Sequence, residues 1–87
     1  MKIRIRYFAA LRDIVGENEE QLPMLEGAQV ADVRTQLLHR YPQLQPILAR
    51  CVCAVNHRYV APETELHDGD EVVFIPPTGG GQAWRQV

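Results

Sequence analysis

The chain has few aromatic residues, few cysteines and no long run of apolar residues. Aromatic side chains make up 7% of its 87 residues, two residues are cysteines, and Lys2 is its single lysine. Two cysteines do not make a disulfide framework, and no apolar run approaches the roughly 20 residues that cross a bilayer. Nine basic and eleven acidic residues give a formal net charge of −2. A general nucleic-acid-binding protein is not expected, because such proteins carry an excess of basic residues.

The N-terminal sequence MKIRIRYF alternates charged and apolar residues, so we expect no signal peptide. The length fits one domain, and 46% hydrophobic residues are typical of a globular chain. We therefore expect a cytoplasmic protein that makes no membrane contact. Its single domain is expected over residues 1–77, followed by a flexible tail over residues 78–87.

The first part of the chain is predicted to contain two strands and a short helix. Apolar and charged side chains alternate over residues 2–8, which is typical of a half-buried strand. Residues 9–15 are predicted to form a helical turn that stops at Gly16. A second strand is predicted over residues 21–25, and Pro23 favours an edge position because proline has no N–H group to donate.

The strongest helix pattern covers residues 30–41, where apolar residues fall on one face and a proline follows. One further turn is predicted within residues 44–48. The apolar stretches 51–56 and 71–75 are typical of strands inside a sheet, and residues 59–60 return from a turn as a short strand. The predicted class is α+β, with one main helix packed on a mixed sheet of four to five strands.

Residues 76–87 read PPTGGGQAWRQV and combine two prolines with three consecutive glycines. Glycine loses the most entropy on ordering, so the glycines predict a flexible strip of backbone, and the prolines hold its base extended. A strip without Cβ atoms fits a narrow tunnel and delivers a C-terminal carboxyl group to a remote active site. The alternative is a frayed tail, because glycine-rich termini are usually disordered.

Four stretches together resemble a known family, the ubiquitin-like β-grasp sulfur carriers, and most closely the small subunits of molybdopterin synthase. The first and last stretches are the most specific, and the resemblance implies the β-grasp fold. The stretches are YFAALRDIVG at 7–16, LEGAQVADV at 25–33, AVNHRYV at 54–60 and LHDGDEVVFIPPTGGG at 66–81.

The resemblance also implies a function. In this family the terminal glycine is adenylated by an ATP-using activating enzyme and is then converted to a thiocarboxylate. The tail enters the large subunit of the synthase, and its sulfur passes to cyclic pyranopterin monophosphate during molybdenum cofactor biosynthesis. The chain would therefore be a co-substrate that binds no cofactor and no metal, while ATP is used by its partner.

The family ends with Pro-Pro, a two-residue spacer and Gly-Gly, which makes Gly81 the terminal glycine. Matching the letters Thr-Gly-Gly makes Gly80 terminal instead. Residues 82–87 follow Gly81 and leave no free glycine carboxyl group to be adenylated. Three explanations are open: a peptidase removes these residues, the carrier is fused to another domain, or the chain has lost sulfur transfer. We expect removal by a peptidase.

Phe8 is an apolar residue on the otherwise polar face of the first predicted strand. Isolated apolar residues are normal on a protein surface. The resemblance, however, places Phe8 in a patch that contacts the activating enzyme and the large subunit. The complete set of implied partner contacts is Phe8, Arg12, Tyr59, Ile75, Pro76 and Pro77.

Two cysteines and three histidines are the remaining candidates for site chemistry. Cys51 and Cys53 share one face of a strand but lie too far apart for an unstrained disulfide. A zinc site needs four ligands at recognisable spacing, so we expect buried thiols that pack the strand. His39, His57 and His67 are expected on the surface.

Two alternative functions remain open on the sequence. A related carrier would use the same glycine chemistry for thiamin biosynthesis, cysteine biosynthesis or tRNA thiolation. A non-catalytic ubiquitin-like interaction module would keep the fold and carry a passive tail. The FAALR and FIPP stretches favour the molybdopterin synthase carrier.

Overall fold

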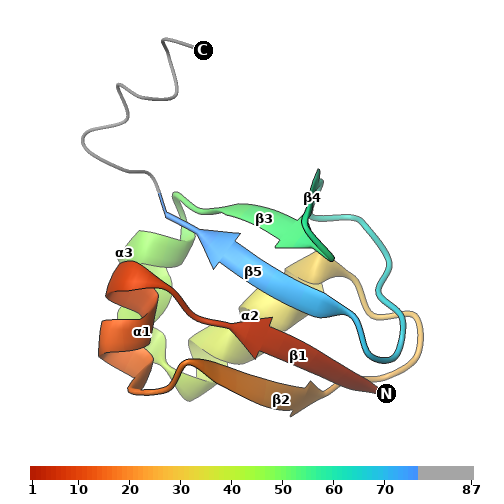
Figure 1. Cartoon of the computed structure of the whole chain (residues 1–87), viewed down its shortest axis with the longest axis horizontal. Helices are drawn as coiled ribbons and strands as arrows, with labels where there is room; N and C mark the ends of the chain where they lie inside the picture. The colour runs from red at the N-terminus through yellow and green to blue at the C-terminus, as the bar shows by residue number, and fades with distance from the viewer. Residues whose placement is uncertain (77–87) are drawn as a thin grey trace, which may run out of the picture.

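Five strands and one long helix dominate the described part of the chain (Figure 1). The structure is a computed structural model, and it describes residues 1–76. The predictions for Pro77, Gly80, Gly81 and the tail lie outside these residues. The elements are β1 (Lys2–Arg6), α1 (Ala9–Val15), β2 (Glu19–Pro23), α2 (Val30–Arg40), the 3-10 turn η1 (Pro42–Leu44), α3 (Gln45–Leu48), β3 (Val52–Val55), β4 (Arg58–Val60) and β5 (Glu71–Ile75).

The strands form one mixed sheet in the order β2-β1-β5-β3-β4. β1 and β5 run parallel, with Arg4 opposite Glu71, and the other three strand pairs are antiparallel. The last strand in sequence is therefore the central strand of the sheet. The predicted mixed sheet is confirmed, and so is the edge position of the strand that contains Pro23.

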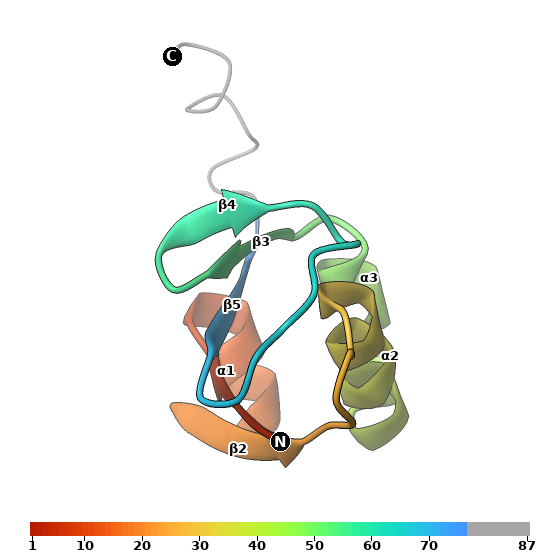
Figure 2. The same cartoon turned by 90° about the vertical axis from the view of Figure 1, so that its right-hand side faces the viewer.

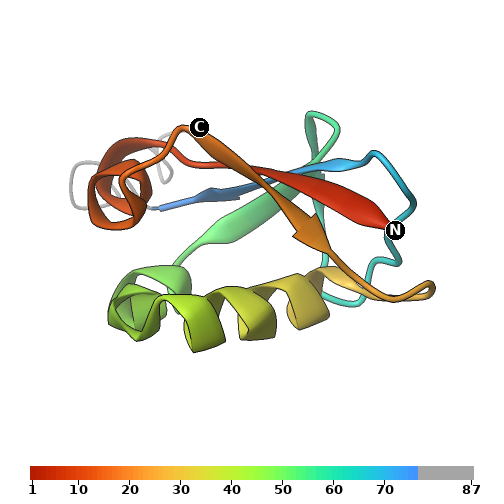
Figure 3. The same ribbon diagram turned by 90° about the horizontal axis from the view of Figure 1, so that it is seen from below.

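Helix α2 crosses one face of the sheet, and Figure 3 shows the two layers edge-on. Alternate strand residues point toward this helix because successive side chains of a strand face opposite sides. The packed layer between sheet and helix is the hydrophobic core. Its residues are Ile3, Ile5, Tyr7, Leu11, Leu22, Val30, Val33, Leu37, Leu44, Leu48, Cys53, Val55, Leu66, Val72 and Phe74.

The ends of both predicted helices are explained by local hydrogen bonds. Gly16 adopts a left-handed conformation at φ 86°, and its N–H donates to the carbonyl of Arg12 at 2.8 Å. This confirms the predicted stop. At the start of α2 the Asp32 carboxylate accepts the N–H of Gln29 at 2.8 Å. The helix ends one residue earlier than predicted, at Arg40.

The second strand was predicted two residues too late in the chain. It covers Glu19–Pro23 instead of residues 21–25. The strand starts earlier because Glu19 and Glu20 already pair with Arg6 and Ile5 of β1. The hydroxyl group of Tyr7 also donates to the Glu20 carboxylate at 2.7 Å. Leu25, which was predicted inside the strand, lies beyond it with 85% of its surface exposed.

The connection over residues 61–70 runs from β4 past the N-terminal end of α2 to β5 (Figure 2). The N–H groups of Val30 and Ala31 donate to the carbonyls of Thr64 and Pro62 at 3.0 and 2.9 Å. These bonds satisfy donors that the first turn of a helix leaves free. Among residues 1–76, no helix is long and apolar enough to span a membrane.

Candidate functional site

The face of the sheet opposite α2 is the candidate site. It shows a continuous row of four residues across the sheet, because Arg6 lies opposite Val73, Val73 opposite Ala54, and Ala54 opposite Tyr59. Ile75 belongs to the same face because it lies two residues after Val73 on β5.

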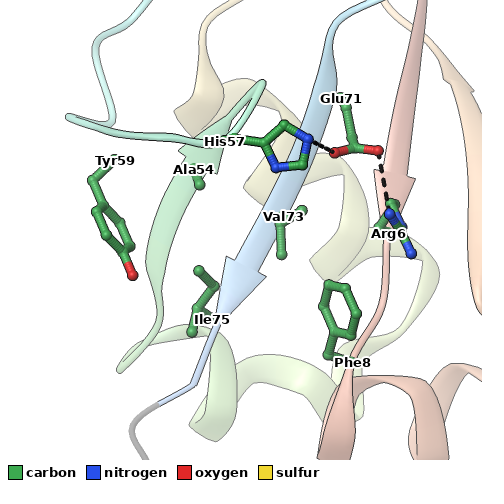
Figure 4. Close-up of a pocket in the computed structure, with 8 residues that line it drawn as sticks. All are labelled: Arg6, Phe8, Ala54, His57, Tyr59, Glu71, Val73 and Ile75. Atoms are coloured by element: carbon green, nitrogen blue, oxygen red, sulfur yellow. Dashed lines mark ion pairs between the residues drawn. The ribbon is translucent and has the colours of Figure 1, made fainter.

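This face contains a shallow hollow of about 270 Å³, which we call the open-face hollow (Figure 4). Two aromatic residues flank it: Phe8 is 44% exposed and Tyr59 is 68% exposed. Apolar groups in the middle with charged groups at one end are typical of a protein-binding surface. Its lining residues are Arg6, Phe8, Ala54, His57, Tyr59, Glu71, Val73 and Ile75.

The structure brings together three of the predicted contact residues, Phe8, Tyr59 and Ile75, around one hollow. These residues come from three separate parts of the chain. Pro76 follows β5 and lines a second hollow with Ala10, Pro46, Ile47 and Arg50. Arg12 is exposed on α1 and is not among the residues that line the open-face hollow.

A buried carboxylate lies at one end of the open-face hollow. The side chain of Glu71 is only 8% exposed, and its Oε2 accepts a hydrogen bond from Arg4 Nη2 at 3.2 Å. The same oxygen lies 3.7 Å from Arg6 Nη1. The other oxygen, Oε1, lies 3.7 Å from His57 Nε2. Groups from β1, β5 and the β3–β4 turn therefore meet at one carboxylate.

Arg6 connects this charge cluster to the aromatic flank of the hollow. Its guanidinium carbon lies 5.2 Å from the centre of the Phe8 ring, within the range of a cation–π contact. The guanidinium group therefore contacts Glu71 on one side and Phe8 on the other.

Five lining residues were missed from the sequence, and Glu71 and Arg6 are the most important of them. The stretch 71–75 was interpreted as a fully apolar strand, which hid the burial of Glu71. Strand periodicity contains the missing signal, because Glu71 and Val73 share a face with Ile75. The complete missed set is Arg6, Ala54, His57, Glu71 and Val73.

The two cysteines are free thiols on the helix side of the molecule rather than at the hollow. Cys53 is buried in the core, as predicted, and Cys51 is half-buried just before β3. Burial raises the pKa of each thiol from 9.0 to about 11, so neither is an activated nucleophile. Within residues 1–76, no three His, Cys, Asp or Glu side chains are grouped to hold a metal ion.

The fold defines a ubiquitin-like β-grasp domain with a hollow on the open face of its sheet. The chain belongs to the ThiS family, which matches residues 5–81. Among curated relatives, the molybdopterin synthase sulfur carrier subunit of Chlamydomonas reinhardtii is 40% identical over 83 residues, covering 93% of this chain and all of the relative. The subunit of that name in Mycobacterium tuberculosis is 39% identical over 83 residues, covering 93% of this chain and 99% of the relative.

Solved structures agree with this assignment. A putative molybdopterin converting factor, subunit 1, from Pyrococcus furiosus superposes with a TM-score of 0.81 at 34% identity, covering 88% of this chain and 98% of that one. A second similar chain, at a TM-score of 0.68 and 24% identity, comes from a complex of subunits 1 and 2 of molybdopterin-converting factor from Helicobacter pylori. It covers 93% of this chain and 100% of that one. At that identity the second likeness shows the fold alone.

Proposed function

We propose that this chain is the sulfur carrier subunit of molybdopterin synthase and acts in the cytoplasm. The observation that carries the proposal is the match over the full length of a relative with that name at 40% identity. The open-face hollow supports it, because Phe8, Tyr59 and Ile75 form the kind of apolar patch that a carrier presents to a large subunit and an activating enzyme.

The proposed chemistry takes place at Gly81. The activating enzyme joins the Gly81 carboxylate to the AMP part of ATP and releases pyrophosphate. A sulfur donor then displaces AMP and leaves a thiocarboxylate, which is a nucleophile. Inside the large subunit the sulfur moves to cyclic pyranopterin monophosphate, and water restores the carboxylate. The carrier supplies the reacting group, whereas the partners supply acid, base and nucleotide.

Gly81 is proposed over Gly80 because the family match ends at residue 81. Residues 82–87 follow it in this sequence. An amide bond to Gln82 leaves no carboxylate at Gly81, so we propose that a peptidase cuts after Gly81 before adenylation.

The test is the intact mass of the protein from its native host, grown under conditions that induce molybdenum enzymes. The expected result is a chain that ends at Gly81, with a fraction in which one oxygen is replaced by sulfur. Retention of residues 82–87 in every molecule would overturn the proposed chemistry for this chain.

A reconstituted synthase supplies the second test. Gly81→Ala is expected to abolish sulfur transfer to cyclic pyranopterin monophosphate, while the spacer substitution Thr78→Ala is the matched control and retains it. Normal transfer by Gly81→Ala would overturn the requirement for glycine at this position. A wild-type chain that ends at Gly81 and forms no thiocarboxylate would indicate an interaction module. Thiocarboxylate formation without transfer to this acceptor would indicate a carrier for thiamin, cysteine or tRNA thiolation.

A further inference from the structure

We infer that Glu71 is a positioning residue for partner binding: its buried carboxylate fixes Arg6 against Phe8 and so presets the aromatic flank of the open-face hollow. The inference rests on the proposed function for the identity of the partner. It concerns the described residues alone and does not depend on the chemistry of the C-terminal glycine.

The burial of the charges supports this role. The Glu71 side chain is 8% exposed, whereas those of Arg4 and Arg6 are 48% and 42% exposed. A buried carboxylate is costly unless charged or hydrogen-bonded partners compensate it. Glu71 therefore restrains both arginines, while their outer surfaces stay available to a partner.

The backbone of Glu71 is as strongly fixed as its side chain. Its N–H donates to Asn56 Oδ1 at 3.0 Å, and its carbonyl accepts the N–H of Asn56 at 2.9 Å. Asn56 and His57 form the β3–β4 turn with left-handed φ values of 50° and 70°. Glu71 therefore also anchors the turn that brings Tyr59 to the other flank of the hollow.

The path from Glu71 to the partner-contact residue has one intermediate, Arg6. An unrestrained arginine samples many rotamers, and holding it costs side-chain entropy. In this structure Glu71 holds the guanidinium group at 3.7 Å, and the same group lies over the Phe8 ring at 5.2 Å. The ordering of Arg6 and Phe8 is thus completed before a partner arrives, which reduces the entropic cost of binding.

Glu19 provides a matched control. It lies opposite Arg6 on the edge strand β2 and is exposed. Glu19→Gln and Glu71→Gln remove the same charge from positions beside the same arginine. Among residues 1–76, however, the ion pair of Arg6 is with Glu71. A general effect of surface charge changes both variants equally, whereas positioning by Glu71 changes one.

The first experiment uses the free chain. NMR spectra of the Arg6 Nε–H group and the Phe8 ring are recorded for the wild type, Glu71→Gln and Glu19→Gln. We expect Glu71→Gln to shift both signals toward those of exposed side chains, and Glu19→Gln to leave them in place. Unchanged Arg6 and Phe8 signals in Glu71→Gln would overturn the inference. This test does not depend on the proposed function, because it needs no partner.

The second experiment measures the dissociation constant for the purified large subunit by calorimetry, at a temperature where urea unfolding shows every variant to be folded. Glu71→Gln should bind roughly five- to tenfold more weakly, because Arg6 is then ordered during binding instead of before it. Glu19→Gln should stay within roughly twofold, as expected for a change at an exposed position.

A double variant tests whether the effect of Glu71 on binding passes through Arg6. If Glu71 acts through Arg6, the combination Arg6→Gln with Glu71→Gln binds no more weakly than the worse single variant. Additive losses, or equal losses in Glu71→Gln and Glu19→Gln, would overturn the inference. A wild-type chain that does not bind the large subunit would overturn the proposed function instead. In that case the NMR spectra alone show whether Glu71 orders Arg6 and Phe8.

Discussion

The hydroxyl group of Tyr7 donates a 2.7 Å hydrogen bond to Oε1 of Glu20. Tyr7 is buried just after β1, and Glu20 belongs to the edge strand β2. The hydroxyl group of Tyr41, directly after α2, lies 3.0 and 2.9 Å from the two oxygens of the same carboxylate. One carboxylate therefore connects the edge strand, the segment that follows its neighbour and the end of the main helix.

Tyr7→Phe should lower the free energy of unfolding by roughly 1–2 kcal/mol, because it removes a part-buried hydrogen bond to a charged group. Urea unfolding followed by circular dichroism measures the change. Tyr59→Phe is the matched control: it removes the same atom from an exposed residue and should change stability by less than about 0.5 kcal/mol. Equal losses in the two variants would contradict the role of the Tyr7–Glu20 bond.

Stability should fall at alkaline pH. Burial, followed by the hydrogen bond to Glu20, raises the pKa of Tyr7 well above 10.0, and the same causes raise the pKa of Tyr41. Burial raises the pKa of Cys53 from 9.0 to about 11. The unfolded chain releases these protons at lower pH than the folded chain, so the stability that these groups contribute is present below about pH 9 and declines above it.

The decline should reach about 1.4 kcal/mol per pH unit for each group between its unfolded and folded pKa. Urea unfolding at pH values from about 8 to 11 measures the slope. Tyr7→Phe should make the slope shallower above about pH 10, and Cys53→Ala should make it shallower from about pH 9. A slope that neither substitution changes would refute this origin of the pH dependence.

Much of the fold was predictable because periodicity and turn residues agree along this chain. The stop at Gly16, the helix over most of 30–41 and the central strand at 71–75 depend on local signals. The start of β2 at Glu19 was not predictable, because Glu20 is held by tyrosines that are distant in sequence. Glu71 was missed for the same reason: the arginines that compensate its charge belong to β1, at the other end of the sequence.

The predicted partner contacts were likewise only partly identifiable from local sequence patterns. Phe8 was identifiable as an apolar residue in the charged positions of the pattern over residues 2–8, although β1 ends at Arg6. Its closeness to Tyr59 and Ile75 depends on the strand order. The family resemblance supplied these two residues, and the sheet places them around the same hollow. Gly80 and Gly81 remain predictions, since they lie outside the described residues.

Phe8→Ser should weaken binding to the large subunit by roughly tenfold or more, because it removes a large aromatic side chain from the open-face hollow, and such truncations at an interface anchor commonly cost this much. Leu25→Ser is the control, since Leu25 is also an exposed apolar residue but lies on the β2–α2 connection, away from the hollow. Calorimetric titration of both variants measures the difference. Equal effects would indicate that the interface is not the open-face hollow.

Ala9 begins α1 directly after Phe8 and has a φ of 50°, in the left-handed region that favours glycine. This conformation costs an L-residue roughly 1–2 kcal/mol. Ala9→Gly should therefore raise the free energy of unfolding by roughly 0.5–1 kcal/mol, after the greater entropy of glycine in the unfolded chain is subtracted. Ala10→Gly, one residue later in the same helix, should lower it by a similar amount, because Ala10 has no such strain to relieve. Urea unfolding should show that the two substitutions change the free energy of unfolding in opposite directions. A loss of stability in both variants would mean that the backbone at Ala9 is unstrained.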